Sequence, residues 1–258
     1  MRTQTGLLLA HTVVVQAVTF MLRPASAYRA LDLDVPAAWL GVLGASFAVV
    51  PLVLAVPSGQ AVDRFGERRI VLAGSGLLAA AGACFVLFAD SVAGLVVTSM
   101  VLGTGHLFAV VGQQALVANR TAADRYDTAF GYYTFAASLG QTFGPGLIVA
   151  FGGDHPIPDT GAIFLGATAL TLPLLVAAVF LRPSAQHRQA AGPAAGGLGG
   201  RAMSLRLTGN RLGQVLIPSA AGALAAGAGA AGVLACTAAG PAGAAVAATG
   251  LHRPPPEP

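Results

Sequence analysis

Six long apolar runs dominate the chain up to residue 181, and each is nearly free of charged residues. They cover residues 6–22, 36–56, 70–89, 92–116, 128–151 and 161–181. A bilayer core of roughly 30 Å needs about 20 apolar residues per helix, and each run is of this order. The runs are apolar around their full circumference, which is typical of helices surrounded by lipid or by one another. The pattern therefore predicts an all-α membrane protein, a polytopic helical bundle.

The chain beyond residue 181 has a different character. Residues 182–211 are rich in glycine, alanine and arginine and too polar to span, so they are expected to form a cytoplasmic linker. A seventh apolar run covers residues 212–236, and a shorter one covers residues 241–251. We therefore expect seven or eight spans in three segments: a six-helix half over 1–181, the linker over 182–211, and a last segment over 212–258 that ends in a proline-rich tail.

Composition supports this class and excludes others. Hydrophobic residues make up 55% and charged residues 9% of the 258 positions, and the mean hydropathy is +0.73. A soluble domain carries about 25% charged residues, so a soluble enzyme, a disordered chain and a disulfide-rich secreted domain are excluded. No H-E-x-x-H, G-x-S-x-G or phosphate-loop pattern occurs in the sequence. We therefore expect no enzyme activity, no cofactor, no metal site and no nucleic-acid partner.

Arginine placement predicts the orientation. With a cytoplasmic amino terminus, eleven arginines fall on the inside and two, Arg23 and Arg29, fall in outside segments. The inside set consists of Arg2, Arg64, Arg68, Arg69, Arg120, Arg125, Arg182, Arg188, Arg201, Arg206 and Arg211. The positive-inside rule therefore predicts a multi-pass protein of the cell (inner or plasma) membrane with its amino terminus in the cytoplasm.

The first run has an alternative interpretation as a secretory signal peptide, because residues 25–27 read Ala-Ser-Ala, like a cleavage site. Against it, the run over 6–22 is longer than a usual signal core, and Arg23 and Pro24 precede the small residues. We expect a retained span.

A specific motif lies between the second and third runs. Residues 59–69 read G-Q-A-V-D-R-F-G-E-R-R, which predicts a tight cytoplasmic turn. The run closely resembles the G-x-x-x-D-R-x-G-R-R signature that the major facilitator superfamily carries between its second and third helices. The matching residues, which the resemblance implies to be a gating loop, are Gly59, Asp63, Arg64, Gly66, Arg68 and Arg69. The family fold has two six-helix halves, and residues 6–181 resemble the amino-terminal half.

Two weaker resemblances follow. Gly140, Gly144 and Pro145 in the fifth run resemble the family's G-x-x-x-G-P motif, which is associated with antiporters; a plain packing kink is the alternative. Residues 212–218 share L-G-Q-x-x-x-P with residues 139–145, and the family's eleventh helix is the second-half counterpart of its fifth. The resemblance therefore implies a truncated second half in which helices seven to ten are missing.

Polar residues recur at helical spacing in three runs. In the family, the first, fourth and fifth helices line the central cavity, so these residues are candidate cavity-lining side chains; interhelical hydrogen bonding is the alternative. They are Thr12, Gln16, Thr19, Ser99, His106, Gln113, Thr134, Ser138 and Gln141. No acidic residue lies in the middle of a run, so the cavity is expected to be neutral and to suit an uncharged or amphipathic solute.

The resemblance implies transport of a small solute across the lipid bilayer by alternating access, with export as one direction. Because one six-helix half forms a single wall of such a cavity, a homodimer or a second half-transporter is expected as a partner. The alternative is a truncated remnant without transport activity, acting at most as a membrane interaction partner.

Overall fold

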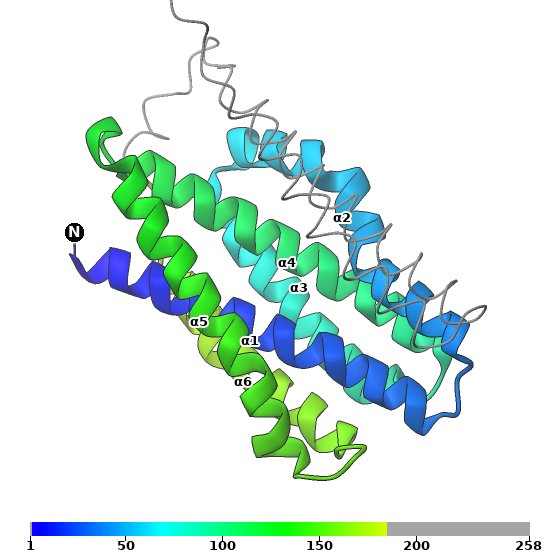
Figure 1. The fold of residues 1–258 in the computed structure, drawn as a ribbon. Helices are drawn as coiled ribbons and strands as arrows, with labels where there is room; N and C mark the ends of the chain where they lie inside the picture. Colours follow the sequence, from blue (N-terminus) through cyan, green and yellow to red (C-terminus); the bar gives the residue numbers. More distant parts are fainter. Residues whose placement is uncertain (1, 185–258) are drawn as a thin grey trace, which may run out of the picture.

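A computed structural model describes residues 2–184, and in this part of the chain six long helices follow one another (Figure 1). They are α1 (Arg2–Asp32), α2 (Ala37–Phe65), α3 (Glu67–Phe88), α4 (Val92–Arg120), α5 (Tyr126–Gly152) and α6 (Thr160–Phe180), with a short 3-10 helix, η1 (Ala123–Arg125), before α5. All six are long and apolar enough to cross a membrane, and no strand occurs within residues 2–184. The all-helical class is thus confirmed. The predicted runs at 212–236 and 241–251 lie outside the described residues.

The helices are longer than the apolar runs that predicted them. α1 continues ten residues past the end of the run at 6–22, through Arg23 and Pro24, to Asp32. α2 continues past residue 56 to Phe65. An apolar run ends at the first charge, whereas a helix continues for as long as its backbone groups pair within it. Arg23 and Arg29, which follow the first apolar run, therefore lie within α1 rather than in a connecting loop.

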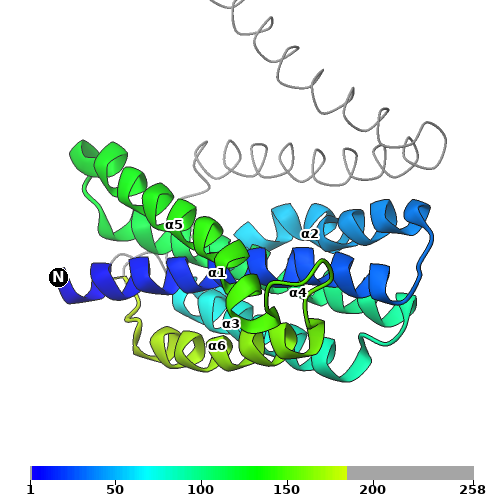
Figure 2. The ribbon, with the colours of Figure 1, turned by 60° about the horizontal axis from the view of Figure 1, so that its bottom comes forward.

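The helices pack in a pattern that repeats between the two halves of the bundle. The most extensive contacts join α3 to α4, α1 to α5, α2 to α4, α3 to α6 and α1 to α6. If α1, α2 and α3 are exchanged for α4, α5 and α6 in order, the α1–α5 pair becomes α4–α2 and the α3–α4 pair becomes α6–α1. The α3–α6 pair is unchanged by this exchange. Figure 2 shows α1 between α5 and α6. This is the arrangement expected of two three-helix repeats.

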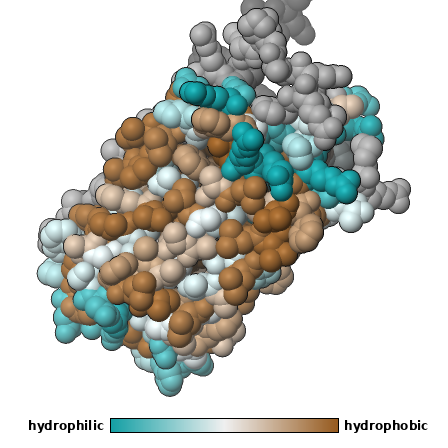
Figure 3. Space-filling model, turned by 180° about the vertical axis from the view of Figure 1, so that it is seen from behind, coloured by the Kyte–Doolittle hydropathy of each residue, from teal (hydrophilic) through white to brown (hydrophobic). Residues whose placement is uncertain are grey.

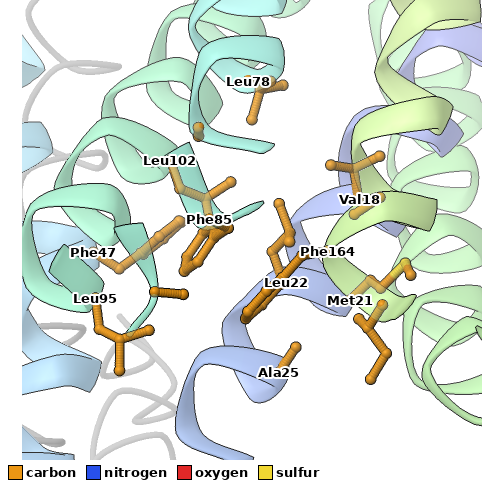
Figure 4. Packing of buried hydrophobic residues seen from close by; sticks show 14 of the residues in the cluster. Val18, Met21, Leu22, Ala25, Phe47, Leu78, Phe85, Leu95, Leu102 and Phe164 are labelled. Carbon is orange, nitrogen blue, oxygen red and sulfur yellow. The ribbon is translucent and has the colours of Figure 1, made fainter. Parts of the chain in front are cut away.

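The apolar core lies where α1, α3, α4 and α6 meet. Leu22, Phe85 and Leu102 are at most 1% exposed there (Figure 4). The rings of Phe85 and Phe164 stack with their centres 5.0 Å apart, which fastens α3 to α6. Since lipid is as apolar as these side chains, close packing rather than exclusion of water holds the helices together.

The two ends of the bundle carry different charges. At the end where α1 stops, Arg29 pairs with Asp32 at 2.5 Å and also with Asp90 in the turn between α3 and α4. The opposite end holds most of the arginines of the described part, among them Arg64, Arg68 and Arg120. Between the hydrophilic ends runs a broad apolar band (Figure 3), as expected for a surface that faces lipid.

Candidate functional site

The signature residues form a one-residue turn rather than an extended loop. α2 runs through Gly59, Asp63 and Arg64 to Phe65, and α3 begins at Glu67. Only Gly66 lies between them, with φ at +88°, a conformation that side chains with a β-carbon rarely adopt. The turn therefore needs a glycine at this position.

The charged residues of the signature have different surroundings. Asp63, Arg64 and Arg69 are exposed, and within residues 2–184 Asp63 takes part in no ion pair. Arg68 instead donates from Nε to the Leu181 carbonyl and from a terminal nitrogen to the Val179 carbonyl, both at 2.7 Å. Arg68 thus binds the start of α3 to the end of α6.

Glu67 is a functional candidate that sequence reasoning missed, because a glutamate next to two arginines looks like a surface residue. It is fully buried, and its Oε1 accepts a hydrogen bond from the Ser184 backbone N–H at 2.8 Å. The Arg120 guanidinium donates to the carbonyl of Arg182 nearby. The Gln4 side chain accepts from the Arg182 N–H at 3.0 Å. The signature end of the bundle therefore holds the chain that leaves α6.

Above this end, a buried chain of hydrogen bonds joins four helices. Tyr133 donates to Gln113 Oε1 at 3.3 Å, and Gln113 Nε2 lies 2.8 Å from His11 Nδ1. Because an amide nitrogen can only donate, Nδ1 accepts and the neutral ring carries its proton on Nε2. That nitrogen lies 3.0 Å from Ser75 Oγ, which itself donates to the Val71 carbonyl at 2.8 Å. Gln113 therefore joins helices in the bundle interior.

The other polar residues predicted in α1 and α4 are mostly buried. Thr12 and Thr19 are fully buried and donate to the carbonyls of Leu8 and Val15, one turn back. Gln16 is 5% exposed, and its Oε1 has no hydrogen-bond partner within residues 2–184.

The polar residues of α5 have the opposite surroundings. Thr134, Ser138 and Gln141 are all exposed. α6, by contrast, exposes large apolar side chains such as Leu165, Leu172 and Val176. The three residues therefore form a polar stripe on α5, beside exposed apolar side chains such as Phe135 and Phe143, whereas the outer face of α6 is apolar.

The glycine motif of α5 lies against α1. Gly140 and Gly144 are buried, and β-carbons at these positions would lie 2.7 Å from the β-carbons of Gln16 and Phe20 respectively. Pro145 is exposed, and α5 continues through it to Gly152. The two glycines therefore allow close packing of α1 and α5, as small residues do in membrane helices.

A pocket of about 280 Å³ opens between α1, α2 and α4, near the end where α1 meets α2. Its wall includes Arg23 and Ser99, with apolar Phe20, Leu40 and Phe47. The His106 ring lies 5.6 Å from the Phe47 ring, measured between the ring centres. Arg23 belongs to α1 and lines this pocket, so the pocket itself carries a positive charge. The small residues after Pro24 were the sequence signal that α1 continues past Arg23.

Comparisons with known proteins agree with this fold. A family model described as Major Facilitator Superfamily matches residues 8–199. Multidrug resistance protein 2 of Bacillus subtilis (strain 168) is 29% identical over 145 residues, which are 55% of this chain and 34% of that protein. Multidrug resistance protein 1 of the same organism is 29% identical over 108 residues, 42% of this chain and 28% of that protein. The chain thus spans about a third of the curated relatives it matches.

Solved structures resemble it in fold. The xylose transporter XylE from E. coli, in an inward-open conformation, matches with a TM-score of 0.60 at 14% identity, over 83% of this chain and 54% of the other. An auto-inhibited peptide transporter of the POT family matches with a TM-score of 0.51 at 16% identity, over 85% and 52%. With the signature turn, the repeated helix packing and the family match over most of its length, this chain belongs to the major facilitator superfamily.

Proposed function

We propose that this chain forms one wall of an alternating-access pathway that moves a small amphipathic solute across the cell membrane, in the direction of export. The observation that carries the proposal is the exposed polar stripe of α5, formed by Thr134, Ser138 and Gln141. Polar side chains in a membrane span normally face a protein partner or a water-filled cavity, because lipid cannot pair with them. The apolar outer face of α6 suits lipid instead.

Family membership and the names of the curated relatives support transport and the direction. Both relatives are multidrug resistance proteins, which favours extrusion of amphipathic compounds. The matched solved structures are about twice as long as the region they share with this chain. The second wall would then come from a second copy of this chain or from a separate half-transporter.

The proposed orientation places the signature turn in the cytoplasm, since the arginine-rich end of the bundle is the one that the positive-inside rule retains there. A cysteine test checks it. In a variant without Cys84 and Cys236, an impermeant maleimide added to intact cells should label Asp154→Cys but should reach Arg69→Cys only after permeabilisation. Arg69 and Asp154 are both exposed. The reverse pattern would invert the topology.

Vesicle transport tests the function itself. The full chain in sealed vesicles should move at least one of three amphipathic dyes, cationic ethidium, zwitterionic rhodamine B or anionic fluorescein, with or without a pH gradient. Ser138→Trp, on the α5 stripe, should reduce the rate at least tenfold. The matched control Leu172→Trp, on the lipid-facing side of α6, should leave it within twofold.

Absence of movement for all three dyes, with folded protein at a density that permits dimers, would favour the alternative of a remnant without transport activity. Equal loss in both tryptophan variants would show that the α5 stripe has no special role. Chemical cross-linking in the same vesicles reports whether a second copy lies nearby.

A further inference from the structure

We propose that the pocket between α1, α2 and α4 is a binding site for the anionic group of an amphipathic carboxylate, held by Arg23 and Ser99. The inference rests on the proposed function, because it names the substrate class of that pathway. It begins from a cation inside a spanning helix. Arg23 lies nine residues before the end of α1, which places it about 13 Å from that end at 1.5 Å per residue.

Within residues 2–184, Arg23 has an aromatic contact but no anionic partner. Its guanidinium carbon lies over the Phe47 ring of α2, 4.3 Å from the ring centre, which is a cation–π contact. The ion pairs within residues 2–184 involve Arg29 and Arg125, and the Arg23 guanidinium makes no hydrogen bond in that part of the chain. A ring satisfies the face of a guanidinium, but its N–H donors lie along the edge. Those donors therefore remain for a ligand in the pocket.

A second donor faces the same space from α4. Ser99 is 3% exposed, lines the pocket, and makes no hydrogen bond within the described residues. Arg23 and Ser99 thus present a charged fork and a hydroxyl from two helices. A planar carboxylate matches a guanidinium fork with two parallel hydrogen bonds.

The remaining wall selects for an apolar body. Phe20, Leu40, Leu43 and Phe47 line the pocket beside the two donors. A volume of about 280 Å³ is at the small end for ligand pockets, so it suits a compact aromatic or short aliphatic acid. A bare inorganic anion would make no apolar contact with this wall.

Arg29 shows what a satisfied arginine looks like in the same helix. It pairs with both Asp32 and Asp90 and does not line this pocket. Arg29→Gln is therefore a matched control for Arg23→Gln, since each removes one positive charge from the same end of α1.

The test is equilibrium binding of radiolabelled benzoate to the full chain in phosphatidylcholine vesicles, competed by unlabelled benzoate or by its uncharged analogue benzamide. Benzoate should compete at least tenfold better than benzamide. Arg23→Gln should weaken benzoate binding at least tenfold, Ser99→Ala should weaken it less, and Arg29→Gln should leave it within twofold. Equal competition by the acid and the amide would overturn the proposal without any variant, so a folding defect of Arg23→Gln cannot hide the answer.

Anionic lipid headgroups offer the same chemistry and need a separate arm. Benzoate affinity should stay within twofold when phosphatidylglycerol is added to the vesicles. Loss of benzoate binding on that addition would assign the pocket to lipid and overturn the proposal. Because binding is measured without transport, absent benzoate binding alongside dye movement would refute only this inference. Benzoate binding without movement of any dye would leave the site and refute the proposed function.

Discussion

A β-carbon on Gly140 would lie 2.2 Å from the carbonyl oxygen of Val13. The backbone of α5 therefore touches the backbone of α1 at a position that has room only for hydrogen. The same β-carbon would lie 2.7 Å from the β-carbon of Gln16, so α5 also packs closely against this side chain.

Replacement of Gly140 should loosen this contact. We expect Gly140→Ala to lower the free energy of unfolding by about 1–3 kcal/mol, because α1 and α5 must move apart to admit the methyl group. Thermal unfolding in detergent measures the change. Gly146→Ala is the control, since a β-carbon there meets nothing within 4 Å. Equal stability of the two variants would contradict the close approach.

The buried hydrogen-bond chain through Gln113 should contribute modestly to stability. Gln113→Leu removes the bonds to both His11 and Tyr133, and interhelical hydrogen bonds in membranes average about 0.6 kcal/mol each. We expect a loss of about 1–2 kcal/mol in unfolding measurements, and a smaller loss for Tyr133→Phe. Gln141→Leu, at an exposed position of α5, should change stability little. If Tyr133→Phe lowered the free energy of unfolding more than Gln113→Leu, the central position of Gln113 in the hydrogen-bond chain would be wrong.

Glu67 should protect the segment that follows α6. In Glu67→Ala the Ser184 N–H loses its carboxylate acceptor, and a bond to a charged group contributes about 1.5–3 kcal/mol. Hydrogen exchange of the peptide containing Ser184 should therefore speed up by roughly tenfold or more. Arg69→Ala removes a neighbouring exposed charge and should leave that exchange unchanged. Unaltered exchange in Glu67→Ala would show that the contact does not hold the segment.

Replacement of Gln16 should reduce transport without reducing stability. Its Oε1 is buried without a partner within residues 2–184, so Gln16→Leu removes an unpaired polar group and should leave stability equal or higher. If the amide serves the pathway, dye movement in vesicles should fall severalfold in the same variant. A variant that is destabilised but transports normally would contradict both expectations.

The six spans and the position of the signature could be predicted from the sequence, because both depend on local properties. An apolar run about 20 residues long finds its lowest free energy as a helix in lipid, whatever its neighbours are. The turn at Gly66 could likewise be predicted, since the positive φ at that residue is a local requirement. The class of the protein therefore followed from the order of apolar, charged and glycine residues.

Only the tertiary structure decided what each polar side chain does. Thr12, Gln113 and Ser138 each belong to a set of polar residues at helical spacing, yet the first two are buried and Ser138 is exposed. The difference arises because helix packing determines which face of each helix is covered. Arg23 ended an apolar run in the sequence, and its position over Phe47 depends on how α1 lies against α2. Spacing along one helix defines a face, but the partner of that face comes from residues far away in the chain.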